Sequence, residues 1–177
     1  MSAGSLFLVG PMGAGKSTLG RLLADCLNWT FVDADRVIEE RAGADIPWIF
    51  DLEGEGGFRQ RETQVLEELT QVPGQVLATG GGAVIRPENR AVLSERGTVV
   101  YLRTSIAAQL RRTSKDRSRP LLQKPDPEKV LTDLLQQREP HYLAIADIVV
   151  DTDHYHPRAL AEHIIDIYRH GSNHKAS

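Results

Sequence analysis

The sequence predicts an α/β protein with a five-stranded parallel sheet between helices, and three observations support this fold class. Short apolar runs alternate along the chain with stretches in which apolar residues recur at helical spacing. The runs are apolar at successive positions, which indicates strands buried on both faces of a sheet. A glycine-rich segment joins the first run to the first helical stretch. Strands that alternate with helices in this way form parallel sheets.

The predicted strands are the five apolar runs, at residues 6–9, 30–32, 76–79, 98–102 and 148–150. The clearest helix covers residues 16–27, where apolar side chains at 19, 22, 23, 26 and 27 share one face, so that Cys26 is expected in the core.

Two later helices have marked starts. Asp126 is a predicted cap ahead of Pro127 in the first turn, and Pro157 opens a second helix over residues 158–168. Residues 113–124 are charged and without periodicity, which predicts a long loop, and residues 171–177 are expected to form a frayed, flexible tail.

The composition narrows the class of protein. The chain has 177 residues, 41% of them hydrophobic, with 24 acidic against 21 basic residues and a net charge of −3. This balance argues against a nucleic-acid or membrane-surface binder, because both need a basic footprint. One cysteine allows no internal disulfide, and no run is long enough for a membrane span or a secretory signal. We expect a cytoplasmic monomer with one domain over residues 1–170.

A phosphate-binding motif fills the turn after the first strand. Residues 10–17 read Gly-Pro-Met-Gly-Ala-Gly-Lys-Ser, which matches G-x-x-x-x-G-K-[ST]. Its backbone N–H groups can surround a phosphate at a helix N-terminus, Lys16 can reach the β- and γ-phosphates, and Ser17 can ligate Mg²⁺. The predicted contacts to ATP are Gly13, Ala14, Gly15, Lys16, Ser17 and Thr18.

The remaining sequence indicates which kind of nucleotide protein this is. A GTPase would need a guanine-reading Asn-Lys-x-Asp, and no Asn here is followed by Lys, although residues 51–54 do fit D-x-x-G. The length favours a small kinase.

Further motifs follow in a fixed order. They are Asp33-Ala34-Asp35, the segment 54–62 with Phe58-Arg59-Gln60-Arg61-Glu62, Thr79-Gly80-Gly81-Gly82, Arg119-Pro120-Leu121-Leu122 and Arg138-Glu139-Pro140-His141-Tyr142. With the phosphate loop, this series closely resembles the shikimate kinase family over about residues 6–168.

The resemblance implies a three-layer P-loop kinase fold with strand order 2-3-1-4-5. It also implies phosphorylation of shikimate by ATP, with Mg²⁺, to shikimate 3-phosphate on the pathway to chorismate and the aromatic amino acids.

The resemblance also implies roles for residues in the segment 33–61 and beyond. Arg59 and Arg138 would clamp the shikimate carboxylate with help from the Gly81 N–H, since a guanidinium fork matches a carboxylate. Asp35 would bind the ring hydroxyls, including the one that attacks, and can take its proton. Asp33 would hold Mg²⁺ beside Ser17, directly or through water. On an extended segment the side chains of residues 33 and 35 would point the same way.

A basic segment completes the predicted site. Residues 103–124 carry seven basic residues and one acid, which fits a lid over the triphosphate centred on residues 113–124. By resemblance, Arg119 would be an arginine finger, Arg112 would stack on adenine, and Tyr155 would line the adenine pocket.

Each assignment has a plainer alternative. Asp33 and Asp35 could only cap a helix, Arg59 and Glu62 could be a surface i,i+3 pair, residues 80–82 could be a tight turn, and Arg138 could be solvated. The six histidines show no metal-ligand spacing. For function, the alternatives are a gluconate- or nucleotide-type kinase and a nucleotide-binding regulatory module without catalysis.

Overall fold

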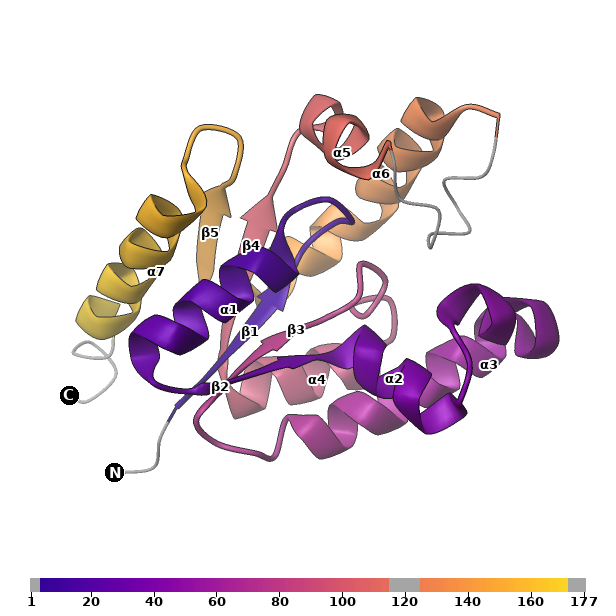
Figure 1. Ribbon diagram of the computed structural model, residues 1–177, viewed down its shortest axis with the longest axis horizontal. Helices are drawn as coiled ribbons and strands as arrows, with labels where there is room; N and C mark the ends of the chain where they lie inside the picture. Colours follow the sequence, from indigo (N-terminus) through magenta and orange to yellow (C-terminus); the bar gives the residue numbers. More distant parts are fainter. Residues whose placement is uncertain (1–3, 115–124, 172–177) are drawn as a thin grey trace.

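The computed structural model describes residues 4–114 and 125–171, and it is built around one sheet of five parallel strands (Figure 1). The strands are β1 (Ser5–Val9), β2 (Thr30–Asp33), β3 (Gln75–Ala78), β4 (Thr98–Arg103) and β5 (Ile148–Asp151). Their order in the sheet is β2-β3-β1-β4-β5. This confirms the predicted fold class and the strand order that the resemblance implied.

Helices cover both faces of the sheet. One face is covered by α1 (Lys16–Leu27) and α7 (Pro157–Gly171), which lie together (Figure 1). The other face is covered by four helices: α2 (Ala34–Ala42), α3 (Ile46–Leu69), α4 (Pro87–Arg96) and α6 (Pro127–Ile145). The short α5 (Ile106–Thr113) follows β4.

The central strand explains why the runs are apolar at every position. Leu6 and Leu8 of β1 are buried in the core beneath α1 and α7, while Phe7 and Val9 are buried in the core on the opposite face. Because side chains alternate across a strand, a strand between two helical layers needs apolar residues on both sides.

The structure differs from the sequence prediction in the placement of Cys26 and at the ends of two predicted segments. Cys26 is exposed, so its prediction as a core residue was wrong. In α1 the buried residues are Leu19, Gly20, Leu23 and Ala24, and Leu27 also packs against the core, so the buried face is turned away from Cys26. Thr113 and Gly171, which were expected to begin a loop and a tail, are the last residues of α5 and α7.

All five strands run in the same direction, so their carboxyl ends meet at one edge of the sheet. The phosphate loop leaves β1 at this edge, α2 begins directly after β2, and the three glycines follow β3. This edge is where ligands of parallel α/β sheets bind.

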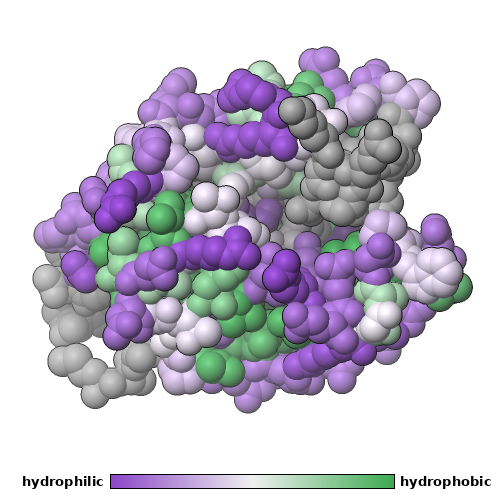
Figure 2. Space-filling view, viewed as in Figure 1, coloured by the Kyte–Doolittle hydropathy of each residue, from purple (hydrophilic) through white to green (hydrophobic). Residues whose placement is uncertain are grey.

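In the view of Figure 1, the surface is mostly hydrophilic, with apolar patches between polar stretches (Figure 2). Among residues 4–114 and 125–171, no helix combines the length and the apolar content needed to cross a membrane.

Candidate active site

The phosphate loop forms a cavity at the N-terminus of α1. Gly13 and Gly15 have φ angles of 78° and 87°, which favour glycine and let the chain turn tightly into the helix. The Lys16 ammonium donates hydrogen bonds to the carbonyl oxygens of Gly10 and Pro11, at 2.5 and 2.9 Å. The cavity measures about 350 Å³, and all six predicted ATP contacts, residues 13–18, line it.

Asp33 serves two purposes at the end of β2. Its Oδ1 accepts hydrogen bonds from the backbone N–H groups of Asp35 and Arg36, at 3.0 and 3.4 Å, and so caps α2. Its Oδ2 accepts a hydrogen bond of 2.9 Å from the Ser17 hydroxyl. The capping alternative for Asp33 is therefore correct, but the same carboxylate also lies beside the phosphate loop.

The Ser17 and Asp33 oxygens suit a magnesium ion. Mg²⁺ prefers hard oxygen ligands and commonly uses one or two carboxylates together with substrate phosphates. Within the described part of the chain, no three His, Cys, Asp or Glu side chains are grouped as a metal cage. A site with one hydroxyl and one carboxylate fits an ion that arrives with the nucleotide.

Asp35 lies in the first turn of α2, because the helix begins at Ala34. The expectation that residues 33 and 35 share an extended segment was therefore wrong. Both carboxylates nevertheless line the phosphate-loop cavity, and both also line a second cavity of about 240 Å³.

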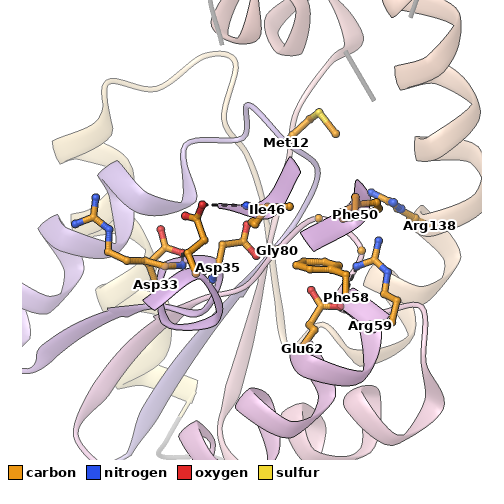
Figure 3. Close-up of a pocket in the computed structure, with 14 residues that line it drawn as sticks. Met12, Asp33, Asp35, Ile46, Phe50, Phe58, Arg59, Glu62, Gly80 and Arg138 are labelled. Atoms are coloured by element: carbon orange, nitrogen blue, oxygen red, sulfur yellow. Dashed lines mark hydrogen bonds and ion pairs between the residues drawn. The ribbon is translucent and has the colours of Figure 1, made fainter. Parts of the chain in front are cut away.

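This second cavity, which we call the acid pocket, is lined by charged residues of both signs, including Arg36, Glu39 and Glu62. Figure 3 shows Asp33 and Asp35 on one side and Arg59 and Arg138 on the other. Its lining also includes apolar residues to which the sequence analysis assigned no role: Met12, Ile46, Phe50 and Phe58. For residues 46, 50 and 58 the helical spacing was a usable signal. That spacing is interrupted at Gly54, where φ is 72° and ψ is 178°.

Arg59 is held by a buried carboxylate. Its Nη1 donates to Glu62 Oε1 at 2.9 Å, and the two side chains are 9% and 1% exposed, so the surface-pair alternative was wrong. Burial raises the pKa of the Glu62 carboxyl, an effect that the positive charge of Arg59 partly offsets. Among the described residues, Arg59 Nε and Glu62 Oε2 are buried without hydrogen-bond partners, which suits a polar ligand.

Arg138 is buried in α6, which rules out the solvated alternative. Burial lowers the pKa of its guanidinium, because desolvation disfavours the charged form. Two buried cations in one pocket suit an anionic ligand, because its negative charge would offset the free-energy cost of burying them.

Side chains of the site lie close against Gly80, Gly81 and Gly82, and at Gly80 and Gly82 they leave no room for a Cβ atom unless they move. A Cβ atom would lie 2.7 Å from Asp35 Oδ1 at Gly80, 3.3 Å from Arg138 Nη1 at Gly81 and 2.6 Å from Arg59 Cζ at Gly82. None of the three has a positive φ, so the requirement is space and not backbone conformation. The segment does make a turn, with the Ala83 N–H donating to the Gly80 carbonyl at 3.1 Å, but the turn alone does not explain three glycines.

A third cavity, of about 210 Å³, adjoins the phosphate loop and brings Arg112 and Tyr155 together. Arg112 Nη1 donates to the Gly13 carbonyl at 3.0 Å and to Thr152 Oγ1 at 3.3 Å. Tyr155 is half exposed and stacks on His163 with ring centroids 5.9 Å apart. The structure thus places both predicted adenine contacts at one site.

The predicted lid is only partly described. Arg119 and residues 115–124 lie outside the described residues. Arg103 does not belong to a lid, because it ends β4 and forms an ion pair with Asp151 at 2.7 Å. Arg111 and Arg112 lie on α5, so the basic cluster of the sequence comes from a strand and a helix as well as the lid segment.

The chain is similar to proteins of known family. The family model described as shikimate kinase matches residues 12–169. The shikimate kinase of Chromohalobacter salexigens is 60% identical over 161 residues, which are 91% of this chain and 89% of that protein. A solved structure of shikimate kinase from Acinetobacter baumannii in complex with shikimate superposes with a TM-score of 0.93 at 50% identity, covering 96% of this chain and 94% of that one.

A gluconokinase from Sinorhizobium meliloti gives a TM-score of 0.63 at 16% identity. That likeness shows a shared fold and no more.

Proposed function

The chain belongs to the shikimate kinase family, and on that basis we propose that it transfers the γ-phosphoryl group of ATP to shikimate, giving ADP and shikimate 3-phosphate. This is a step on the pathway to chorismate. The observation that carries the proposal is that the phosphate-loop cavity and the acid pocket share Asp33 and Asp35. A phosphoryl donor in one cavity and an acceptor in the other meet at these carboxylates.

The acid pocket binds the acceptor by its carboxylate. Arg59 and Arg138 supply two guanidinium forks on the wall opposite Asp35, and the backbone N–H of Gly81 is the third donor. The ring of shikimate then extends across the pocket toward Asp35. Phe50 and Phe58 provide the apolar wall that a cyclohexene ring needs.

Asp35 orients the attacking hydroxyl. The hydroxyl oxygen forms a bond to the γ-phosphorus, the bond from that phosphorus to the β–γ bridging oxygen breaks, and the hydroxyl proton passes to the Asp35 carboxylate. Little covalent chemistry remains for the protein, so catalysis depends on alignment and charge.

The donor side neutralises the charge of the triphosphate. Lys16 brings an ammonium to the β- and γ-phosphates. Ser17 and Asp33 would hold Mg²⁺, which would supply further positive charge against the triphosphate. Arg119 acts as the arginine finger, as the family resemblance implies. Arg112 and Tyr155 receive the adenine in the third cavity.

The proposal includes a single domain over residues 1–170 that acts as a monomer in the cytoplasm, without a nucleic-acid or membrane partner. The acidic balance and single cysteine of the sequence support it. Family membership and the apolar wall of Phe50 and Phe58, which suits a carbon ring, favour shikimate over the open polar chain of gluconate or a nucleotide as the acceptor. Occupied catalytic positions argue against a non-catalytic module.

A coupled ADP-release assay tests the function directly. Shikimate, quinate, gluconate and nucleoside monophosphates are compared as acceptors at saturating Mg·ATP. We expect turnover with shikimate far above the rate without acceptor. Turnover with another acceptor and none with shikimate would overturn the assignment.

The carboxylate clamp gives a second test. Replacing Arg59 or Arg138 with Lys keeps the positive charge but removes the bidentate fork, so KM for shikimate should rise about tenfold or more. A tenfold rise corresponds to a loss of about 1.4 kcal/mol in the free energy of shikimate binding. KM for ATP should change little. The measurement is steady-state kinetics with each substrate varied in turn.

Arg61→Lys is the matched control for this test. Arg61 lies on the same helix and pairs with Glu53 at the surface, at 2.7 Å, away from the pocket. Its KM for shikimate should stay within about twofold of wild type, because surface ion pairs contribute little. Normal shikimate saturation in both Arg59→Lys and Arg138→Lys would contradict the clamp.

A further inference from the structure

A buried tyrosine connects helix α6 to the three glycines of the acid pocket. Tyr142 lies one helical turn after Arg138 and on the same face of α6, and it is completely buried. Its hydroxyl donates a hydrogen bond of 2.5 Å to the carbonyl oxygen of Gly81, across 61 residues of sequence. Tyr142 therefore links α6 directly to the backbone of the glycine segment.

The Tyr142 ring is also held by a stacking contact. It stacks on Tyr101 of β4, with ring centroids 5.0 Å apart and an interplanar angle of 25°. The Tyr101 hydroxyl donates to Glu139 Oε2 at 2.7 Å, so α6 contacts the sheet through two aromatic rings and one carboxylate. A ring held in this way has little freedom to move its hydroxyl.

The hydrogen bond sets the orientation of the glycine backbone. A peptide unit is planar and trans, so fixing the Gly81 carbonyl also fixes the direction of the Gly82 N–H. The preceding peptide is fixed separately, because the Gly80 carbonyl accepts from the Ala83 N–H at 3.1 Å. Together these two bonds determine where the N–H groups of Gly81 and Gly82 point.

The same segment lies against both arginines. The space beside Gly81 is taken by Arg138 Nη1, and the space beside Gly82 by the Arg59 guanidinium. A small movement of the segment would therefore shift its backbone donors relative to both cations at once. Tyr142 is the side chain that fixes the middle of this segment.

We propose that Tyr142 is a positioning residue for acid recognition: its hydroxyl holds the Gly81 carbonyl so that the glycine N–H groups and the two arginines converge on one carboxylate. The inference rests on the proposed function, because it concerns how the acceptor is bound. Burial raises the pKa of Tyr142 to about 12, so the hydroxyl remains a donor at neutral pH.

The test is Tyr142→Phe, which removes one oxygen and keeps the stacked ring. KM for shikimate should rise about tenfold, because the Gly81 carbonyl loses the hydrogen bond that positions the glycine segment. The values of kcat and of KM for ATP should stay within about twofold. Steady-state kinetics give the three parameters, and circular dichroism and Tm report the fold.

Tyr101→Phe is the matched control. It also removes a buried tyrosine hydroxyl and keeps the same ring stack, but that hydroxyl contacts Glu139 and not the glycine segment. We expect a loss of Tm comparable to that of Tyr142→Phe with KM for shikimate unchanged. If Tyr142→Phe lowers Tm and leaves KM for shikimate at the wild-type value, Tyr142 is only structural and the proposal is overturned.

A ligand-side comparison separates positioning from general damage. The second acceptor is the shikimate analogue whose carboxylate is reduced to a hydroxymethyl group. In wild type this analogue should have a much higher KM than shikimate, and in Tyr142→Phe the ratio of the two KM values should fall about tenfold. The ratio does not depend on the folded fraction of a preparation, so a partly unfolded variant still gives an answer.

An equal loss for acid and alcohol would contradict the positioning role. Failure of the proposed function looks different, because wild type itself would then show no turnover of shikimate.

Discussion

Replacing Asp35 with Asn should lower kcat by about 10²- to 10⁴-fold, the usual contribution of a positioned general base, while Mg·ATP binding stays near the wild-type value. Asn keeps the size of the side chain but loses the negative acceptor and the site for the proton. Asp35 lies where the two cavities meet, so the change acts on the reacting hydroxyl and leaves the residues around the triphosphate in place. The measurements are kcat with shikimate and a separate Mg·ATP binding isotherm.

Asp33→Asn is the companion to this experiment. Asp33 accepts from Ser17 and caps α2, so its replacement should shift the Mg²⁺ dependence of the rate to higher concentrations and also lower Tm. Asn is itself a favoured cap, so the loss of Tm should be modest. A Mg²⁺ titration of the rate distinguishes the two variants. Identical metal profiles, or an Asp35→Asn enzyme with most of its activity, would show that this division between the aspartates is wrong.

Arg119→Ala should lower kcat by about 10³- to 10⁵-fold, as expected for an arginine finger. The expectation comes from the sequence, in which Arg119 precedes Pro120 in a segment rich in basic residues. A guanidinium that contacts the transferring phosphoryl group stabilises charge mainly in the transition state, so binding of shikimate without ATP should be unaffected. Single-turnover kinetics and a shikimate binding isotherm measure the two quantities.

Arg117→Ala is the control for charge in this segment. It removes an equal charge two residues away, where we expect a solvated side chain, so kcat should change less than about threefold. A loss in Arg119→Ala of less than about tenfold, or similar losses in both variants, would assign the segment a general electrostatic role.

The fold was largely predictable because its signals are local. The first helix was predicted at residues 16–27 and is observed at Lys16–Leu27, because the glycine turn marks its start and apolar spacing marks its face. Cys26 was misplaced because apolar spacing alone does not show that the buried face of α1 is turned toward Gly20 and Ala24. Helices α4 and α5 were not predicted, because each buries a single apolar residue, Leu93 in α4 and Ala108 in α5.

The identity of the site residues was predictable where motifs carry the chemistry. The burial of those residues was not predictable, because it depends on packing. Arg59 and Arg138 were named from motifs, but their burial depends on neighbours that lie far away in the chain. Capping and metal binding were treated as alternatives for Asp33, whereas only its Oδ1 caps α2 and its Oδ2 lies beside Ser17 of the phosphate loop. Tyr142 was part of a quoted motif without an assigned role, and its spacing of four residues from Arg138 on a helix was the available signal.

The shared wall between the donor and acceptor cavities also has a consequence for inhibition. One molecule that carries an acid at one end and a nucleoside at the other can occupy both cavities if its tether passes Asp33 and Asp35. Because the cavities adjoin, that tether is short, and the effective concentration of the second end is high once the first is bound. Such linkage typically raises affinity about 10²- to 10⁴-fold over either half without any new contact. The tether passes the carboxylates of Asp33 and Asp35, which would repel a phosphate chain without its metal. An uncharged tether avoids this repulsion.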